Sequence, residues 1–303
     1  MAHTLLTPDV IAKQALASLY ETTVMRGLVH TDLSKEFTTS KVGDTINVRK
    51  PATFVAKDFD RSQGIQLQDG AEGSVPVKLD KFKDVSFAVT DEELTLDIES
   101  FDTQLLTPAM EALAIGVDTS LLDLRSEITN EVGQASGFEY NKPESLIDAG
   151  RVLDQALVPV TGRRAVLGPA FKADWLNTPI LKQADQSGTT EALRRASLGR
   201  DLFGFDTYMT NNIKAPGASP SAGDPTTEVG LAFHDSAFAF ASAPLPKNPG
   251  SASHVATYKG ISLRVTMQHD ITYKQTVVSV DILYGVKVLD PNRAVLIKGA
   301  DAA

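Results

Sequence analysis

The residues of this sequence that could take part in catalysis or metal binding do not stand at the spacings that such chemistry needs. The five histidines are scattered, and none occurs in the His-Glu-x-x-His spacing that places two zinc ligands on one face of a helix. His234 and Asp235 form a tight histidine–acid pair, which we interpret as a loop or capping element, with catalysis as the less favoured alternative. The chain has no cysteine, which excludes disulfides, thiolate metal sites and a cysteine nucleophile.

The motifs of the common nucleotide-binding and hydrolytic enzymes are also missing. No segment matches the phosphate-binding loop that ends in Gly-Lys-Ser/Thr, the dinucleotide-binding glycine pattern or the Gly-x-Ser-x-Gly nucleophile elbow. We therefore expect the protein not to be an enzyme and to need neither a cofactor nor a metal. An α/β enzyme with an unrecognised site is the remote alternative.

The charge of the chain argues against a general attraction to nucleic acid. The formal net charge is -9, whereas phosphate binding needs clustered cationic groups. No aromatic side chains are interleaved with the densest basic groups as a base-stacking surface would need. We expect these arginines to pair with acids across subunit contacts: Arg163, Arg164, Arg194, Arg195 and Arg200.

The most distinctive element that could position side chains is a pair of alternating segments. Ile46 and Val48 alternate with polar residues in Thr45–Val55, and Val75–Val89 repeats the same two-residue period. The pattern predicts one long β-hairpin. A two-stranded ribbon is marginal in water by itself, and no nearby segment of the sequence has a pattern suited to covering it, so we expect a neighbouring subunit to cover it.

Two helices flank this hairpin along the chain. Thr7-Pro8-Asp9 is a good helix start, and an apolar stripe predicts a docked helix that ends near Arg26. After the hairpin, a longer helix is predicted with Thr107-Pro108 dividing it into two collinear pieces. Its apolar residues are spaced by threes and fours, with Glu111, Asp118 and Arg125 on another face: Met110, Leu113, Ala114, Val117, Leu121, Leu124 and Ile128.

The rest of the chain predicts a small α/β unit followed by a sheet. A helix over Asn141–Leu157, a strand over Arg163–Leu167 and a short helix from Pro169 form the α/β unit. Loops are predicted at Lys214–Pro225 and Pro244–Ser253. Alternation predicts further strands in Phe203–Thr207, Val229–Phe233, Ile261–Met267 and Val278–Tyr284.

The sequence shows no sign of a membrane segment or of a secretory signal. Its first residues, Met1–Pro8, lack a basic start and an apolar core, and no apolar run approaches the ~20 residues that span a bilayer. We therefore expect no membrane association and a protein that is made and kept in a cytoplasm.

This order of elements resembles the major capsid proteins of tailed bacteriophages, the family typified by phage Hong Kong 97. Bacterial encapsulins share that fold. Several phrases look like phage capsid sequence, and they occur in the same order: Gly43–Pro51, Val166–Phe171, Leu202–Tyr208 and Tyr284–Val295.

The resemblance implies an α+β, Hong Kong 97-like capsid fold. The implied parts are an N-terminal arm (1–42), an extended hairpin called the E-loop (43–90), a peripheral domain with a spine helix (91–140), an axial α/β domain (141–253) and a return to the peripheral sheet (254–303). Within the peripheral domain, the spine helix corresponds to Ser100–Asn130.

The resemblance also implies a structural function. Copies of the chain would assemble as pentamers and hexamers into the icosahedral head of a virion in the host cytoplasm, enclosing double-stranded DNA without sequence-specific binding. A separate scaffolding protein, a portal and a decoration protein are the implied partners. The alternative is the shell subunit of an encapsulin-type nanocompartment, which encloses a protein cargo.

The implied contacts between subunits lie on the arm and the E-loop. The residues expected to make them are Val10, Leu16, Ile46, Val48, Phe54, Val77, Phe82 and Phe87. Some family members also form a lysine–asparagine cross-link, for which Lys50, Lys57 and Asn292 are the conceivable residues. No assisting glutamate can be placed, so non-covalent assembly is the favoured expectation.

Overall fold

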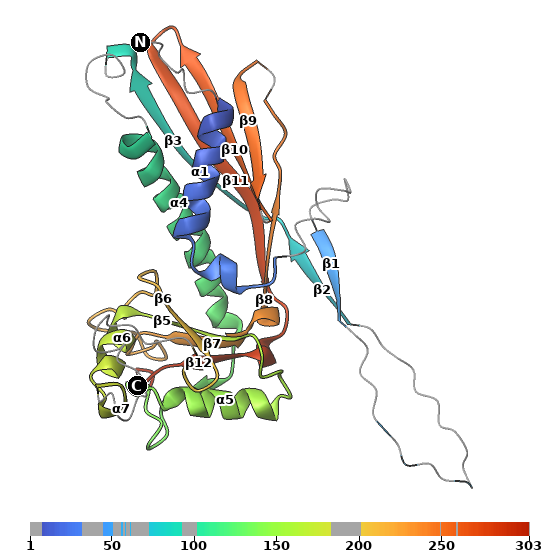
Figure 1. The fold of residues 1–303 in the computed structure, drawn as a ribbon, viewed down its shortest axis with the longest axis vertical. Coiled ribbons are helices and arrows are strands. Elements are labelled where there is room, and N and C mark those ends of the chain that lie inside the picture. Colours follow the sequence, from blue (N-terminus) through green and yellow to red (C-terminus); the bar gives the residue numbers. More distant parts are fainter. Residues whose placement is uncertain are drawn as a thin grey trace.

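The computed structural model of the chain describes residues 8–31, 45–50, 56, 58, 61, 73–92, 102–182, 201–248, 250–258 and 260–302. These residues form two bodies, each built around a five-stranded sheet, and a two-stranded ribbon that projects to one side (Figure 1). We call the sheet of β3, β8, β9, β10 and β11 the long sheet, and that of β4, β5, β6, β7 and β12 the short sheet. The mixture of helices and mainly antiparallel sheets is the α+β class expected from the sequence.

The long sheet is organised around β11 (Gln275–Val288), which pairs with three other strands. It is antiparallel to β3 (Lys81–Thr90) on one side and to β10 (Ile261–Asp270) on the other, where β8 (Phe238–Ala243) continues the pairing. Beyond β10, β9 (Ala252–Tyr258) forms the edge. The predicted alternation is confirmed, because every second side chain of β11 is buried in the core: Val278, Val280, Ile282 and Tyr284.

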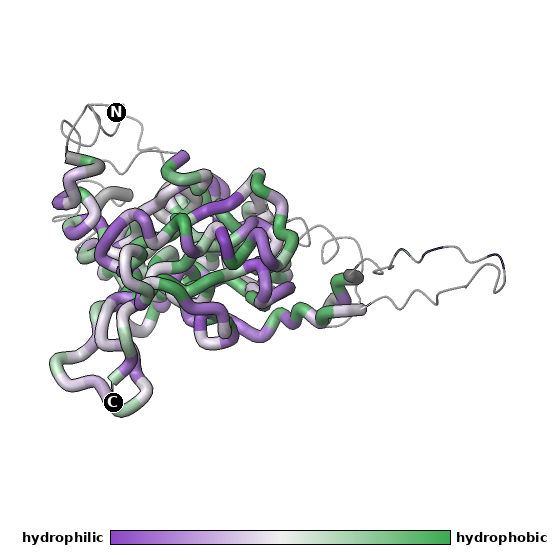
Figure 2. The backbone as a smooth tube through the Cα atoms, turned by 90° about the horizontal axis from the view of Figure 1, so that it is seen from below, coloured by the Kyte–Doolittle hydropathy of each residue, from purple (hydrophilic) through white to green (hydrophobic). Residues whose placement is uncertain are grey.

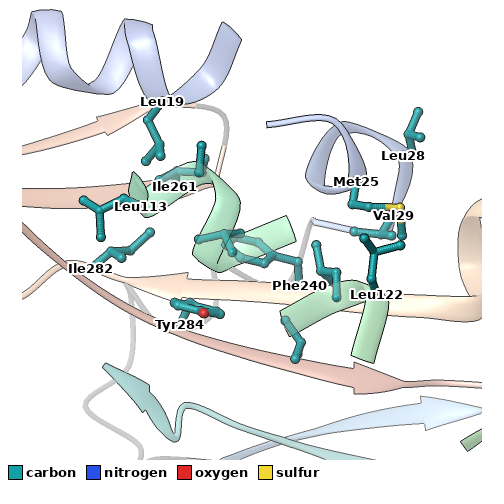
Figure 3. Packing of buried hydrophobic residues seen from close by; sticks show 14 of the residues in the cluster. Leu19, Met25, Leu28, Val29, Leu113, Leu122, Phe240, Ile261, Ile282 and Tyr284 are labelled. Carbon is teal, nitrogen blue, oxygen red and sulfur yellow. The ribbon is translucent and has the colours of Figure 1, made fainter. Parts of the chain in front are cut away.

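Two helices cover one face of the long sheet. α1 (Pro8–Thr22) packs against β9 and β10, and α4 (Thr107–Leu122) packs against α1, β3 and β11. Figure 3 shows Leu19 of α1 and Leu113 of α4 gathered with Ile261 of β10. Removal of these apolar side chains from water is the main stabilising contribution of this layer.

The spine helix has the two-part form that the sequence predicts. A π-helical segment, η2 (Asp102–Leu106), leads directly into α4, and a 3-10 segment, η3 (Asp123–Glu127), ends it. The change from π to α geometry falls at Thr107-Pro108, where the proline lacks the amide that would donate a hydrogen bond to the preceding helical turn.

The spine helix is also long and apolar enough to cross a membrane. The segment Gln104–Glu127 has 24 residues, contrary to the expectation that no apolar run approaches this length. Its apolar residues, including Met110, Leu113 and Val117, are buried against α1 and the long sheet. A core helix that is covered on most sides has the same composition as a membrane span.

The short sheet has the strand order β4-β12-β7-β5-β6. Its strands are β4 (Glu131–Val132), β5 (Arg163–Leu167), β6 (Asp206–Met209), β7 (Gly230–His234) and β12 (Ala294–Ile297). The accompanying helices are α5 (Ser145–Gln155), α6 (Pro169–Leu176) and α7 (Pro179–Lys182). The predicted strand Arg163–Leu167 and the predicted helix start at Pro169 are confirmed.

Both faces of the short sheet are buried. Val166, Leu231 and Leu296 belong to the core that also holds α1, α4 and the long sheet. Their neighbours in sequence face a second core with α5 and α6: Ala165, Leu167, Ala232, Val295 and Ile297. Double burial explains why these strands read as continuous apolar runs.

The domain boundaries expected from the resemblance differ from the observed ones. β8 lies within the predicted axial domain (141–253) but belongs to the long sheet, and β12 lies within the predicted peripheral return (254–303) but belongs to the short sheet. The described segments pass between the two bodies three times, after η3, after β7 and after β11. Contiguous sequence ranges therefore cannot represent the two bodies.

The predicted hairpin is divided between the ribbon and the long sheet. β1 (Thr45–Lys50) pairs with β2 (Gly73–Lys78), but the chain then bends at Leu79-Asp80, and β3 pairs with β11 instead. The E-loop boundary at residue 90 was therefore wrong, because the second half of the return arm is part of the peripheral layer. Residues 51–55 of the outgoing arm lie outside the described residues.

Two details of the predicted strands were also wrong. β6 begins at Asp206 and not at Phe203, because Asp201 and Phe203 adopt positive φ angles that belong to a turn. β8 was not predicted at all. The first five residues of β8 are all buried, so the strand lacks the alternation of apolar and polar residues that marks a half-exposed strand.

Gly285 of β11 lies directly beneath the point where the ribbon leaves the body. A Cβ atom at this position would lie 2.0 Å from the backbone oxygen of Lys78. We expect Gly285→Ala to lower the free energy of unfolding by about 1–3 kcal/mol, because backbone must move to relieve the overlap. Urea denaturation followed by tryptophan fluorescence measures the loss.

Gly217→Ala is the matched control, since nothing lies within 4 Å of a Cβ atom there and the backbone has no positive φ. We expect its unfolding midpoint to match that of the wild type. A Gly285→Ala variant as stable as Gly217→Ala would contradict the close packing of β2 on β11.

Candidate functional site

The histidine–acid pair of the sequence closes a turn and does not form a catalytic relay. His234 Nδ1 lies 2.8 Å from Ser236 Oγ and 3.0 Å from Asp235 Oδ1, and it accepts a hydrogen bond from the Ser236 amide at 3.2 Å. A relay needs the acid and the hydroxyl on opposite ring nitrogens. The capping interpretation of His234 is confirmed.

Metal chemistry finds no support in the described part of the chain. Over these residues, no group of three or more histidine, aspartate and glutamate side chains is arranged to hold an ion. The surfaces on which this chain could contact other molecules are the remaining candidate sites.

Two of the five arginines expected at subunit contacts make their bonds within the chain. Arg163 is buried and donates to Asp154 Oδ1 at 2.6 Å and to the carbonyl oxygen of Val158 at 2.7 Å. Arg164 donates to the carbonyl oxygen of Leu28. Arg163 was therefore wrongly assigned to an intersubunit pair, because α5 and its following loop already surround it. Arg194, Arg195 and Arg200 lie outside the described residues.

The described part of the arm lies on its own subunit. One face of α1 is buried, and Leu16 in that face is only 5% exposed. Asp9 at the start of α1 also pairs with His254 Nε2 of β9 at 2.9 Å. The prediction that Leu16 contacts a neighbour was therefore wrong, whereas Val10, 47% exposed, is available for such a contact.

The ribbon of β1 and β2 is covered at its base, which is the end that joins the body, and the rest of the ribbon projects away from the body. Val77 of β2 is fully buried against Ala239 and Ala241 of β8, with Val48 of β1 packed partly beside it. The prediction that Val77 contacts a neighbour was therefore wrong, because the chain's own long sheet covers the base. Seen from below, the ribbon leaves the body on one side (Figure 2).

The remaining predicted contact residues have different surroundings. Phe87 packs partly into the core of its own chain, whereas Phe82 is 55% exposed on the other face of β3. The backbone of Ile46 pairs with Val77, and its side chain is not described; Phe54 lies outside the described residues. Exposed Val10 and Phe82 therefore stay predictions as intersubunit contacts.

The structure does not test the residues expected to form a cross-link. Asn292, in the 3-10 turn η5 (Pro291–Arg293), is exposed. The Lys50 side chain and the whole of Lys57 are not among the described parts. A cross-link therefore stays a prediction.

The most unusual polar group is Asp118, which the sequence assigned to the polar face of the spine helix. It is completely buried and accepts hydrogen bonds from the Val24 and Met25 amides, at 2.9 and 3.2 Å. Asn212, in the loop after β6, lies 3.5 Å away. Asp118 therefore joins the end of the arm, the spine helix and the short-sheet body.

Burial raises the pKa of Asp118 to about 6, because the charged form loses its hydration, while the amide hydrogen bonds act in the opposite direction. The sequence contained one signal of this role. Asp118 follows Val117 and precedes Leu121 at the spacing of the buried stripe, so a partner for its carboxylate had to be found inside the protein.

Comparison with known proteins relates this arrangement to viral shells. No family model matches the sequence, and no curated protein matches it. Solved structures do match. A structure from Mycobacterium phage Che8 aligns with a TM-score of 0.68 at 20% identity, covering 90% of both chains.

Two further structures match over most of their length. The mature capsid of bacteriophage PhiM1 aligns with a TM-score of 0.61 at 12% identity, covering 93% of this chain and 88% of that one. The virus-like particle from Pyrococcus furiosus aligns with a TM-score of 0.52 at 13% identity, covering 95% of this chain and 97% of that one. At these identities the likeness establishes the fold.

The buried Asp118 makes stability depend on pH in a specific direction. Because its pKa is raised from 3.8 to about 6 on folding, its contribution is fully present below pH 3.8 and is lost as the pH rises through 6. We expect the wild type to lose about 1 kcal/mol more than Asp118→Asn between about pH 5 and pH 7.5, measured by urea unfolding.

Glu111→Gln, which removes an exposed carboxylate from the same helix, is the control and should keep the wild-type slope. Parallel stability curves for the wild type and Asp118→Asn across this range would refute the assignment.

Proposed function

We propose that this chain, which has the Hong Kong 97-like capsid fold of tailed-phage major capsid proteins, is a shell subunit that assembles with copies of itself. The observation that carries the proposal is the projecting ribbon of β1 and β2, on a chain that aligns over most of its length with solved capsid subunits. A two-stranded ribbon is marginal alone, and beyond its base it needs a partner surface.

The division of buried and exposed surface supports the same proposal. The arm helix and the spine helix already pack within their own subunit. Among the described residues, this leaves the ribbon and exposed side chains such as Val10 and Phe82 available for contacts with copies. At ~25 cal/mol per Å², a contact that buries roughly 200 Å² of apolar surface supplies about 5 kcal/mol before entropy is subtracted. Several such contacts per subunit hold a shell while each single contact stays reversible.

The complete particle that we propose is the icosahedral head of a phage. Copies form pentamers and hexamers of an icosahedral head, which encloses double-stranded DNA in the virion after assembly in the host cytoplasm. The net charge of -9 supports a container that does not adsorb DNA by sequence-specific or general attraction. A separate scaffolding protein, a portal and a decoration protein complete this proposal.

The role we propose is structural and not enzymatic. The His234 cluster lacks relay geometry, and the described residues hold no candidate metal group. A shell subunit needs neither feature.

An encapsulin-type compartment is the second candidate. The observation that favours it is the alignment with the Pyrococcus furiosus virus-like particle, which covers 97% of that chain. The two candidates differ in what the shell contains, either DNA or a protein cargo.

Expression of the chain alone tests the proposal. We expect light scattering and negative-stain imaging to show closed shells, rings or tubes of megadalton mass. A chain that stays monomeric at high concentration, with crowding agents and with the scaffolding protein of its native source would contradict the proposal. Nuclease treatment followed by DNA and protein analysis of particles from the native source then distinguishes protected DNA from a protein cargo.

Shortening the ribbon tests its part in assembly. Lys50 pairs directly with Gly73, so an Asn-Gly turn in place of residues 51–72 joins the two strands in register. We expect this variant to keep the thermal stability of the wild-type monomer and to form no particles in light scattering. Normal particles from the shortened chain would show that assembly does not depend on the ribbon.

A further inference from the structure

Helix α5 ends with a leucine at a position where glycine is normally found. The Val158 amide donates to the Leu153 carbonyl and the Leu157 amide to the Asp154 carbonyl, each at 3.0 Å, which is the common closing pattern of helix ends. In this pattern the residue at position 157 takes a left-handed conformation, and Leu157 has a φ of 57°. Glycine tolerates this conformation, whereas a leucine side chain is strained in it.

The Leu157 side chain buries almost none of its surface against its own subunit. Leu157 is 91% exposed, whereas its neighbour Val158 is buried in the second core. Strained residues persist where the surrounding structure holds them and where they serve a function. Backbone hydrogen bonds therefore hold the strained conformation of Leu157, and its exposed side chain adds almost no buried contact to offset the strain.

The loop that carries Leu157 is held in one conformation by Arg163. This buried guanidinium donates to the carbonyl oxygens of Val158 and Pro159, at 2.7 and 3.0 Å, and to Asp154 at 2.6 Å. Rigid presentation lowers the entropy that a partner must overcome on binding. Leu157 and Val160, on either side of the clamped carbonyls, are therefore presented outward in fixed positions.

Further apolar side chains lie beside this loop. Ile147 of α5, Val160 and Phe203 are 43%, 67% and 38% exposed, and they line a groove of about 800 Å³ along α5. Phe203 also has a positive φ, of 50°. We call Ile147, Leu157, Val160 and Phe203 the α5 surface; Figure 1 shows α5 on the side of the short sheet that faces away from the long sheet.

The charged groups around the groove are already neutralised. Arg151 is engaged by Asp148 at 2.7 Å and by Gln155 at 3.1 Å, and Asp154 is engaged by Arg163. Among the described residues around the groove, no net positive charge is left to attract the phosphates of a nucleic acid. The α5 surface therefore fits an apolar protein surface.

We propose that the α5 surface docks on a second copy of this chain. The proposal rests on the proposed function, in which each subunit is surrounded by copies of itself. The exposed apolar area is on the order of a few hundred Å², a size that is often functional on a monomer. It is smaller than the roughly 800 Å² per partner of an interface that is stable alone, so it suits one repeated contact in a large assembly and not an isolated dimer.

Leu157→Gly separates a docking role from a role in folding. Because glycine relieves the strained conformation, the variant monomer should unfold at the same urea concentration as the wild type or a higher one. The lowest protein concentration that gives particles in light scattering should rise by about tenfold, since each contact loses buried apolar surface. Val160→Ser leaves the strained backbone at Leu157 unchanged, and it should also raise the lowest protein concentration that gives particles.

Lys274→Gly is the matched control. Lys274 also has a positive φ, of 52°, but it lies in the turn between β10 and β11 and has a polar side chain. The Lys274→Gly variant should relieve backbone strain without changing the lowest protein concentration that gives particles. If the wild type assembles and both Leu157→Gly and Val160→Ser assemble at its concentration, the docking inference fails while the proposed function stands. A wild-type chain that never assembles would overturn both.

Discussion

Burial of the spine helix between α1 and the long sheet is the interaction on which the rest of the structure depends. Its apolar face shares one core with Ile261 of β10, and the same core reaches Leu231 of β7 and Leu296 of β12 in the short sheet. Elements from the beginning, middle and end of the chain therefore meet on this helix. Because each body leaves part of its apolar surface against the other, the two sheets and the helix are stabilised together.

The same helix contains the carboxylate that fixes the arm. Burying Asp118 costs hydration energy, and the amides of Val24 and Met25 offset part of that cost by donating hydrogen bonds. An apolar residue at this position would leave those amides without acceptors inside the protein. The polar contact therefore specifies where the arm ends on the helix, while the surrounding apolar contacts supply most of the stability.

Two features of the folded chain are unfavourable when the subunit is considered alone. The ribbon of β1 and β2 extends beyond the cover that Ala239 and Ala241 provide, and Leu157 holds a strained backbone with an exposed apolar side chain. Local rules of stability are broken most often at sites where another molecule binds. Both features are accounted for if the free energy is recovered on contact with other copies, which is the demand that a closed shell makes of its subunits.

The sequence by itself determined the local elements and, through their order and a few phrases, the fold family. The start of α1 at Pro8, the strand Arg163–Leu167 and the break at Thr107-Pro108 follow from capping, alternation and proline chemistry, which act within a few residues. Only the tertiary structure decided what lies opposite each side chain. The sequence analysis placed Val77 at a contact with another subunit and Asp118 on the polar face of its helix, but both are buried by segments of their own chain roughly 100 residues or more away. Spacing shows which residues share a face, whereas the packing of distant segments decides whether that face meets its own chain or another copy.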